Sequence, residues 1–190
     1  MKRFIWHRPQ YRCHYFKFGQ PPRPCFHTAS AESGTCSCCG QARELKYNSS
    51  FYSREEPDYL CPWCIADGSA ATHYEGEFND YLGIEGVSAD PDEPDSIVMD
   101  RVLLLEVCER TPSYHSWQQE QWLVHCNQPC AFLGYTDYAE IQTLQAELQA
   151  DIANMPERYL QAISKTGDPV GGYLFRCVKC GMHRLHTDCT

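Results

Sequence analysis

The chain has 190 residues, of which 43% are hydrophobic and 13% aromatic, enough for a packed core, so disorder throughout is excluded. The formal net charge of -9 is uneven, because residues 1–24 hold six Lys and Arg and no acid, whereas the rest holds 10 bases against 25 acids. A body this acidic disfavours nonspecific binding to nucleic acid, and a basic partner or simple solubility explains it better.

The thirteen cysteines bear on the cellular compartment. The N-terminus has the charge of a signal peptide but lacks its apolar run, and no stretch approaches the roughly 18 apolar residues of a membrane span. We therefore expect a cytoplasmic protein with reduced thiols and no membrane span, in which paired cysteines point to a metal.

Residues 1–30 are basic and aromatic, and they contain Pro21, Pro22 and Pro24. Terminal segments of this kind are commonly loosely packed, so we expect an N-terminal arm over residues 1–30. A nucleic-acid-binding arm with interleaved aromatic side chains is the alternative, which the prolines and the acidic body disfavour.

Two Cys-x2-Cys pairs separated by 21 residues follow this arm: Cys36 with Cys39, and Cys61 with Cys64. Each pair turns two thiolates towards one point, and two pairs supply the four ligands of a tetrahedral zinc ion. The segment between them, residues 44–59, contains several residues that favour strands. The pattern predicts zinc-ribbon-like β-hairpins, with a first zinc site spanning residues 36–64.

Two alternatives remain open in this region. Cys38 could compete with Cys39 as a ligand, although Cys36 and Cys39 have the better spacing. The Cys-Pro-Trp-Cys sequence at residues 61–64 could instead be the dithiol of a thiol oxidoreductase, if the helix expected after it lowers one thiol pKa. A redox dithiol does not need the upstream cysteine pair, which favours the zinc site.

Acidic side chains dominate residues 75–100, which contain nine Asp and Glu and no base. The Asp-Pro turns at residues 90–95 predict a loop. Such segments are usually solvated surfaces, and the calcium-loop signature is absent. The functional alternative is a docking surface for a basic protein, centred on residues 85–100.

Further helix and strand signals follow in chain order. We expect a short helix over residues 66–74, a helix capped by Ser96 and running to about Arg110, and a strand over residues 121–125. Thr136 is placed to cap a helix that ends near residue 155, and Pro156 can begin another. With a last strand at residues 173–176, the sequence predicts an α+β fold with several short helices.

A second cluster combines Cys126 and Cys130 with Cys177 and Cys180, which lie 46 residues further on. Both pairs adjoin predicted strands, so they could meet and form a second zinc site spanning residues 126–180. The alternative ligands are His125, His183, His186 and Cys189.

An enzymatic alternative arises if one ligand of this second site is water. The zinc ion would then activate that water in a metal-dependent hydrolase, with Glu120 as the natural general base and Glu120 or His125 assisting the reaction. Structural zinc and packed tryptophans at positions 117 and 122 need no further assumption, so we prefer a non-enzymatic protein and assign no catalytic residue.

Several longer segments resemble the bacterial CbrC family and cover most of residues 35–181. They are Tyr59–Ala71, Glu85–Ser88, Glu106–Pro112, Ser116–Trp122, His125–Asn127 with Pro129–Phe132, and Tyr173–Cys177 with Cys180–Gly181. The resemblance implies a cytoplasmic protein associated with colicin tolerance and without an assigned reaction. It also implies an immunity-like role, in which the acidic surface occupies the basic cleft of a bacterial toxin.

The sequence thus predicts an arm, residues 1–30, and a CbrC-like zinc-binding α+β domain, residues 31–190. We expect this protein to act by protein binding through its acidic surface, with a basic partner such as a toxin.

Overall fold

The computed structural model describes residues 28–189. The arm predicted for residues 1–30 therefore falls almost wholly outside the described residues, as do Cys13 and Cys25. Its last two residues, Ala29 and Ser30, belong to a strand.

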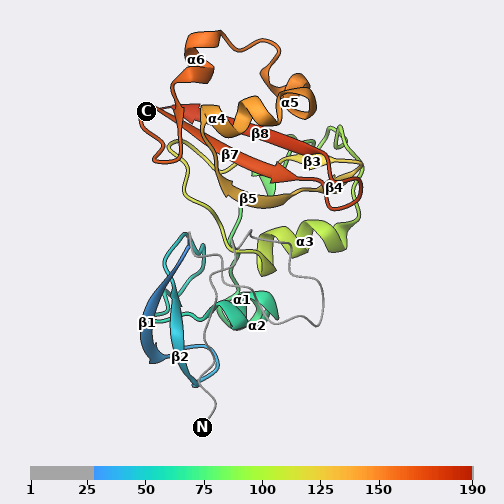
Figure 1. Ribbon diagram of the computed structural model, residues 1–190. Helices are drawn as coiled ribbons and strands as arrows, with labels where there is room; N and C mark the ends of the chain where they lie inside the picture. The colour runs from blue at the N-terminus through green and yellow to red at the C-terminus, as the bar shows by residue number, and fades with distance from the viewer. Residues whose placement is uncertain (1–27, 190) are drawn as a thin grey trace.

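The N-terminal part is a hairpin with two short helices beside it (Figure 1). β1 (Ala29–Thr35) pairs antiparallel with β2 (Ala42–Tyr47), and α1 (Pro62–Ala66) and α2 (Ser69–Tyr74) follow. Proline at the first position starts α1, because its fixed φ suits a helix and its missing N–H would have no helical partner. Gly68, at a φ of 79°, ends the first helix and turns the chain into the second.

This hairpin is not the one predicted from the sequence. β2 pairs with β1, which precedes the first cysteine pair, and not with a strand between the two pairs. The second cysteine pair lies at the start of α1 rather than at the end of a strand. The zinc ribbon is therefore not confirmed, whereas the mixed α+β architecture with short helices is.

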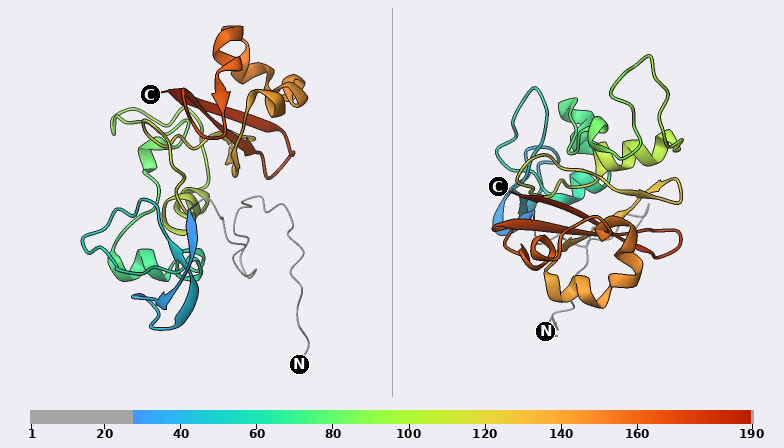
Figure 2. Two further views of the ribbon diagram at one scale, coloured as in Figure 1. Left: turned by 60° about the vertical axis from the view of Figure 1, so that its left-hand side comes forward. Right: turned by 90° about the horizontal axis from the view of Figure 1, so that it is seen from above.

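A four-stranded sheet forms the C-terminal part. β7 (Val170–Arg176) is its centre, pairing antiparallel with β5 (Ala131–Tyr135) and β8 (His183–Cys189) and parallel with β6 (Ile163–Ser164). α4 (Tyr138–Thr143), α5 (Gln145–Ile152) and α6 (Glu157–Gln161) lie on one side of the sheet, and α3 (Arg101–Arg110) lies on the other (Figures 1 and 2). A short 3-10 helix, Tyr81–Gly83, precedes the acidic loop.

A small hairpin beside this sheet supplies part of the candidate site. β3 (Val124–His125) and β4 (Gln128–Pro129) are joined by Cys126 and Asn127, whose φ angles are 55° and 58°. Positive φ at both central residues is typical of a type I′ turn, whose twist matches that of the flanking strands. Cysteine seldom adopts a positive φ, so the backbone at Cys126 is locally strained.

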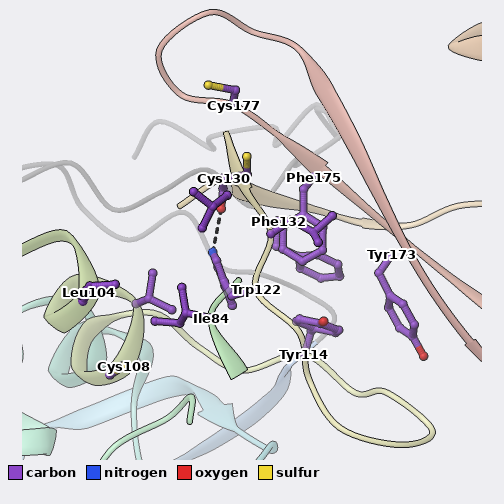
Figure 3. Close-up of a cluster of buried hydrophobic side chains, with 13 residues drawn as sticks. Ile84, Leu104, Cys108, Tyr114, Trp122, Cys130, Phe132, Tyr173, Phe175 and Cys177 are labelled. Atoms are coloured by element: carbon purple, nitrogen blue, oxygen red, sulfur yellow. Dashed lines mark hydrogen bonds between the residues drawn. The ribbon is translucent and has the colours of Figure 1, made fainter. Parts of the chain in front are cut away.

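Among residues 28–189 the buried hydrophobic side chains form three clusters. One surrounds the first cysteine group and includes Tyr47, Tyr59, Ile65 and Phe78. The central part is aromatic and joins α3 to the sheet through residues such as Tyr114, Trp122, Phe132, Tyr173 and Phe175 (Figure 3). The third lies between the sheet and α4–α6, around Ile141, Leu148 and Leu174.

Two helices begin later than predicted, because the expected caps are engaged elsewhere. Ser96 donates its hydroxyl to Gly86 O at 3.3 Å, and α3 instead starts after Asp100, whose Oδ1 accepts from Val102 N at 2.9 Å. Thr136 is fully buried and donates its N–H to Gly172 O at 2.9 Å, so Asp137 caps α4.

Candidate metal centres

The first cysteine group assembles as the spacing predicts. The sulfur atoms of Cys36, Cys39, Cys61 and Cys64 all lie within 4.8 Å of one another. Cys36 lies in the turn between β1 and β2, where its carbonyl accepts from Gly40 N at 2.8 Å, and Cys61 is the N-cap of α1. The turn after β1 and the N-terminus of α1 therefore bring the four thiols together.

The distances in this group suit a tetrahedral metal ion. Four sulfurs at about 2.3 Å from a zinc ion would lie about 3.8 Å apart. The Sγ–Sγ distances are 3.8 Å between Cys36 and Cys64 and 3.5 Å between Cys61 and Cys64. The arrangement can therefore hold a metal ion without rearranging the backbone.

The electrostatics of this group favour one thiolate, at Cys61. Contact with the Cys64 sulfur lowers the pKa of Cys61 to about 5 and raises that of Cys64, so the pair carries a negative charge at neutral pH. The guanidinium of Arg43 lies 4.7 Å from the centre of the Trp63 ring. Burial opposes its charge, but the nearby sulfurs of Cys39 and Cys61 raise the pKa of Arg43. A cation beside the sulfurs stabilises their ionised forms.

Cys38 lies outside this group. Its Sγ is 3.6 Å from the hydroxyl of Ser69, on the neighbouring α2. The structure therefore pairs Cys36 with Cys39, and leaves Cys38 as an additional thiol.

The second group contains a histidine. The ring of His125 and the sulfurs of Cys126, Cys177 and Cys180 have ligand atoms within 4.8 Å of one another. His125 Nδ1 is 3.3 Å from both Cys126 Sγ and Cys180 Sγ. A tetrahedral zinc ion would separate such nitrogen and sulfur ligands by about 3.6 Å. This arrangement can also hold a metal ion, with one ring nitrogen and three thiols.

Cys130, expected among these ligands, lies elsewhere. It is fully buried in the aromatic core, where its backbone N–H donates to Leu123 O at 2.8 Å and its carbonyl accepts from Trp122 Nε1 at 2.8 Å (Figure 3). The β3–β4 turn is the physical reason, since it places His125 and Cys126 at the metal-ligand group and carries Cys130 back into the core. Adjacent His and Cys residues were the sequence signal for this ligand set.

The other alternative ligands of this region have different partners. His183 Nδ1 lies 2.8 Å from Glu147 Oε2, and the His186 ring stacks on Tyr173 with the ring centres 5.6 Å apart. Cys189 is exposed at the end of β8 and is not in the group.

The two groups differ in exposure. In the first group Cys36, Cys61 and Cys64 are buried and Cys39 is exposed, whereas in the second group only Cys177 is buried and Cys126 and Cys180 are exposed. Burial opposes the charge of Cys177, but a hydrogen bond from the Cys180 backbone and the His125 side chain lower its pKa to about 6.

Arg184 on β8 fixes the hairpin of the second group. It donates to Val124 O at 2.5 Å, to Glu85 Oε1 at 3.1 Å and to Asp151 Oδ1 at 3.0 Å. Glu85 Oε2 in turn accepts from Val124 N at 2.7 Å. Val124, the residue before His125, is therefore held through both its backbone N–H and its carbonyl.

Several acids of the segment 75–100 have structural partners. Glu85 pairs with Arg184, Asp80 and Asp100 cap helices, and Asp95 Oδ1 accepts from Ser88 N at 2.9 Å. The exposed acids of the turn are Asp90, Asp92 and Glu93. Glu120, the general base of the hydrolase alternative, is not in the second metal-ligand group.

Within residues 28–189, no helix combines the length and the hydrophobicity needed to cross a membrane.

Comparison with known proteins places the chain among relatives of similar length. UPF0167 protein PA1536 of Pseudomonas aeruginosa is 43% identical over 171 residues, covering 84% of this chain and 88% of the relative. UPF0167 proteins Mb2317 of Mycobacterium bovis and MT2352 of Mycobacterium tuberculosis are each 34% identical over 168 residues, covering 83% of this chain and 84% of the relative. No solved structure matches the chain significantly.

These matches correct the resemblance to the CbrC family. The family model that matches, over residues 16–189, is described as an uncharacterised protein family, UPF0167, and none of these relatives has a name that mentions CbrC or colicin. The chain belongs to the UPF0167 family.

Proposed function

We propose that this protein binds two zinc ions in closed, structural centres and acts by binding another macromolecule rather than by catalysis. This proposal rests on two sets of four Cys or His ligand atoms, and in each set all the atoms lie within 4.8 Å of one another. Four protein ligands complete a tetrahedron and leave no coordination position for a catalytic water. Thiolate-rich sites also favour zinc over the hard cations that prefer oxygen ligands.

The first experiment is zinc analysis of protein purified without a metal-affinity tag. We expect two zinc ions per chain and one in either C61S or H125A. C38S and C130A are the matched controls, because each removes a neighbouring thiol that lies outside the groups, and both should retain two. Two ions in H125A and one in C130A would show that our ligand assignment is wrong.

The difference in exposure supports a second test of the centres. A chelator reaches exposed ligands more readily, so the group of Cys126 and Cys180 should lose its metal first. Release followed with a chromogenic chelator should be biphasic, and the fast phase should be absent in H125A. A single phase with equal rates would contradict this order.

The dithiol alternative has one observation in its favour, the low pKa of Cys61 at the start of α1. Cys61 is nevertheless fully buried and surrounded by three other sulfurs of its group, which makes it inaccessible to a disulfide substrate. Alkylation of native protein tests this directly. Rapid modification of Cys61 in zinc-loaded protein would support the oxidoreductase instead.

For the macromolecular partner, we propose a basic protein that docks on the turn at residues 90–95. Asp90, Asp92 and Glu93 are exposed there, and the turn is braced by hydrogen bonds from Asp92 N to Asp90 Oδ1 at 2.9 Å and from Ser88 N to Asp95. A fixed array of like charges attracts an opposite charge with little loss of conformational entropy.

The test compares two triple variants in a crosslinking pull-down from cells of the source organism. D90N/D92N/E93Q should lose the basic partners of the native protein. E44Q/E55Q/E56Q removes equal charge from exposed positions elsewhere and should keep them. Equal partner recovery with both variants would show that the turn is not the docking surface.

A further inference from the structure

A cavity of about 380 Å³ lies apart from both metal-ligand groups. Aromatic rings make up much of its wall, from Trp117, Tyr135, Tyr173 and His115, and the loop Lys165–Gly167 forms another part. This volume is within the range of roughly 300–1,000 Å³ for small-molecule sites, which are mostly apolar with a few polar groups.

The aromatic wall is held in place by hydrogen bonds. Trp117 Nε1 donates to Gly167 O at 2.7 Å, and Trp117 N donates to Asp188 Oδ2 at 2.8 Å. The same carboxylate, only 5% exposed, accepts from the Tyr173 hydroxyl at 2.7 Å. Trp117 is 52% exposed despite these anchors, so burial in the core does not explain its position.

Glycine is required where the loop approaches this ring. A Cβ at position 167 would lie 2.7 Å from Trp117 Nε1, and the φ of Gly167 is 85°. The loop and the tryptophan therefore form one rigid side of the cavity, and little order needs to be created when a ligand binds.

The charges around the cavity favour a cation. Lys165 Nζ lies 3.4 Å from Asp137 Oδ2 and 3.3 Å from Glu140 Oε2, so its charge is matched locally. Asp188, whose carboxylate accepts from the Tyr173 hydroxyl, is a third acid behind the wall, so the charged groups around the cavity carry an excess of two negative charges. The faces of aromatic rings also attract cations, and quaternary ammonium groups are recognised in this way.

We propose that this cavity binds a small alkylammonium compound, with a quaternary or methylated nitrogen against Trp117 and Tyr135. The positive charge is recognised by the rings and the surrounding carboxylates, and the methyl groups by the apolar wall. The site is independent of the metal ions and of the acidic turn, so it can be tested separately from the function proposed above.

The test is calorimetric titration of the zinc-loaded protein with choline and with tetramethylammonium, compared with 3,3-dimethyl-1-butanol, the uncharged analogue of choline. We expect one saturable site for the cations and binding of the analogue weaker by roughly 3- to 30-fold, the range of a cation–π contribution. Quenching of tryptophan fluorescence by choline should accompany binding. No saturable binding of either cation, or equal binding of the analogue, would overturn the proposal.

Variants test whether the cavity recognises the positive charge of the ligand or only its apolar surface. W117A should lose at least tenfold in choline affinity, whereas W117F keeps a ring and should lose less. K165M removes the one Lys or Arg side chain that residues 28–189 contribute to the wall and should strengthen choline binding severalfold, while a site for anions would be weakened. Unchanged zinc content and circular dichroism establish that each variant is folded, and L82A, at an exposed apolar position outside the cavity, should bind as the native protein does.

A vesicle assay distinguishes a free alkylammonium compound from the same group on a lipid headgroup. The site should bind free choline and should not sediment the protein with phosphatidylcholine vesicles. Sedimentation that choline competes away would replace the small molecule with a lipid headgroup and overturn the proposal as stated.

Discussion

The Arg184→Met substitution should be one of the most destabilising single changes on the sheet. Arg184 is 18% exposed, and it joins β8 to α5 through Asp151 and to the segment before the acidic turn through Glu85. Methionine approximates the length of the side chain but removes every donor. Two carboxylates would then remain without their cation.

The expected loss follows from the burial of these two acids. Breaking a buried ion pair by removing one partner typically costs about 3–5 kcal/mol. Asp151 is 10% exposed, so leaving its charge unpaired costs nearly the full free energy of a buried charge. Glu85 is 37% exposed, so water screens its charge and the cost is smaller. Each acid also keeps one backbone donor, from Leu185 and Val124 respectively. We therefore expect a loss of about 3 kcal/mol, at the lower end of the range.

Urea unfolding of zinc-loaded protein measures this loss. The control is Lys46→Met, which breaks an ion pair with Glu32 whose side chains are 28% and 53% exposed and which should cost less than about 1 kcal/mol. E85Q/D151N/R184M should recover part of the stability, because no unpaired charge remains. If R184M and K46M lose equal stability, the reasoning from burial is refuted.

Three further substitutions test other parts of the fold. Burial lowers the pKa of His186 below 6.5, against an opposing effect of Asp188. The unfolded chain therefore takes up the proton first, and stability falls as the pH drops below about 6.5; H186F should flatten the stability profile there, and an unchanged profile would contradict this. A Cβ at Gly172 would lie 2.5 Å from Ile163 Cγ2, so G172A should cost roughly 1–3 kcal/mol by urea unfolding, and an unchanged midpoint would show that the strand adapts freely. D100A removes the cap of α3 and should lower the unfolding free energy by about 1 kcal/mol, while D92A in the turn should not.

The first metal-ligand group could be predicted from the sequence because its geometry is local. A Cys-x2-Cys spacing fixes the relation of two sulfurs within one turn, whatever the rest of the fold does. The spacing of the second pair does not show whether a strand or a helix carries it. Cys61 caps a helix because Pro62 starts one, and the sequence pattern of strand-forming residues between the pairs did not reveal that β2 would pair with β1 instead.

The ligands of the second group depended on a turn that the spacing does not show. Counting Cys-x3-Cys gives Cys130 as the partner of Cys126, but a two-residue turn reverses the chain between them. Cys130 then faces Trp122 in the core, and the adjacent His125 takes its place. The late starts of α3 and α4 have the same origin, since Ser96 and Thr136 are engaged by Gly86 and Gly172, residues distant in sequence.

The hairpin that carries Cys126 has a consequence for the stability of α4, α5 and α6. A metal ion held by Cys126 and Cys177 would cross-link residues about 50 positions apart, and the enclosed segment includes α4, α5 and α6. Because the ligands are brought together only in the folded chain, such an ion would stabilise the fold by about 2.7 kcal/mol at a free concentration 100 times its Kd. Unlike a disulfide, a metal cross-link can be removed by a chelator under reducing conditions, so it would link the persistence of the three helices to the free concentration of the metal.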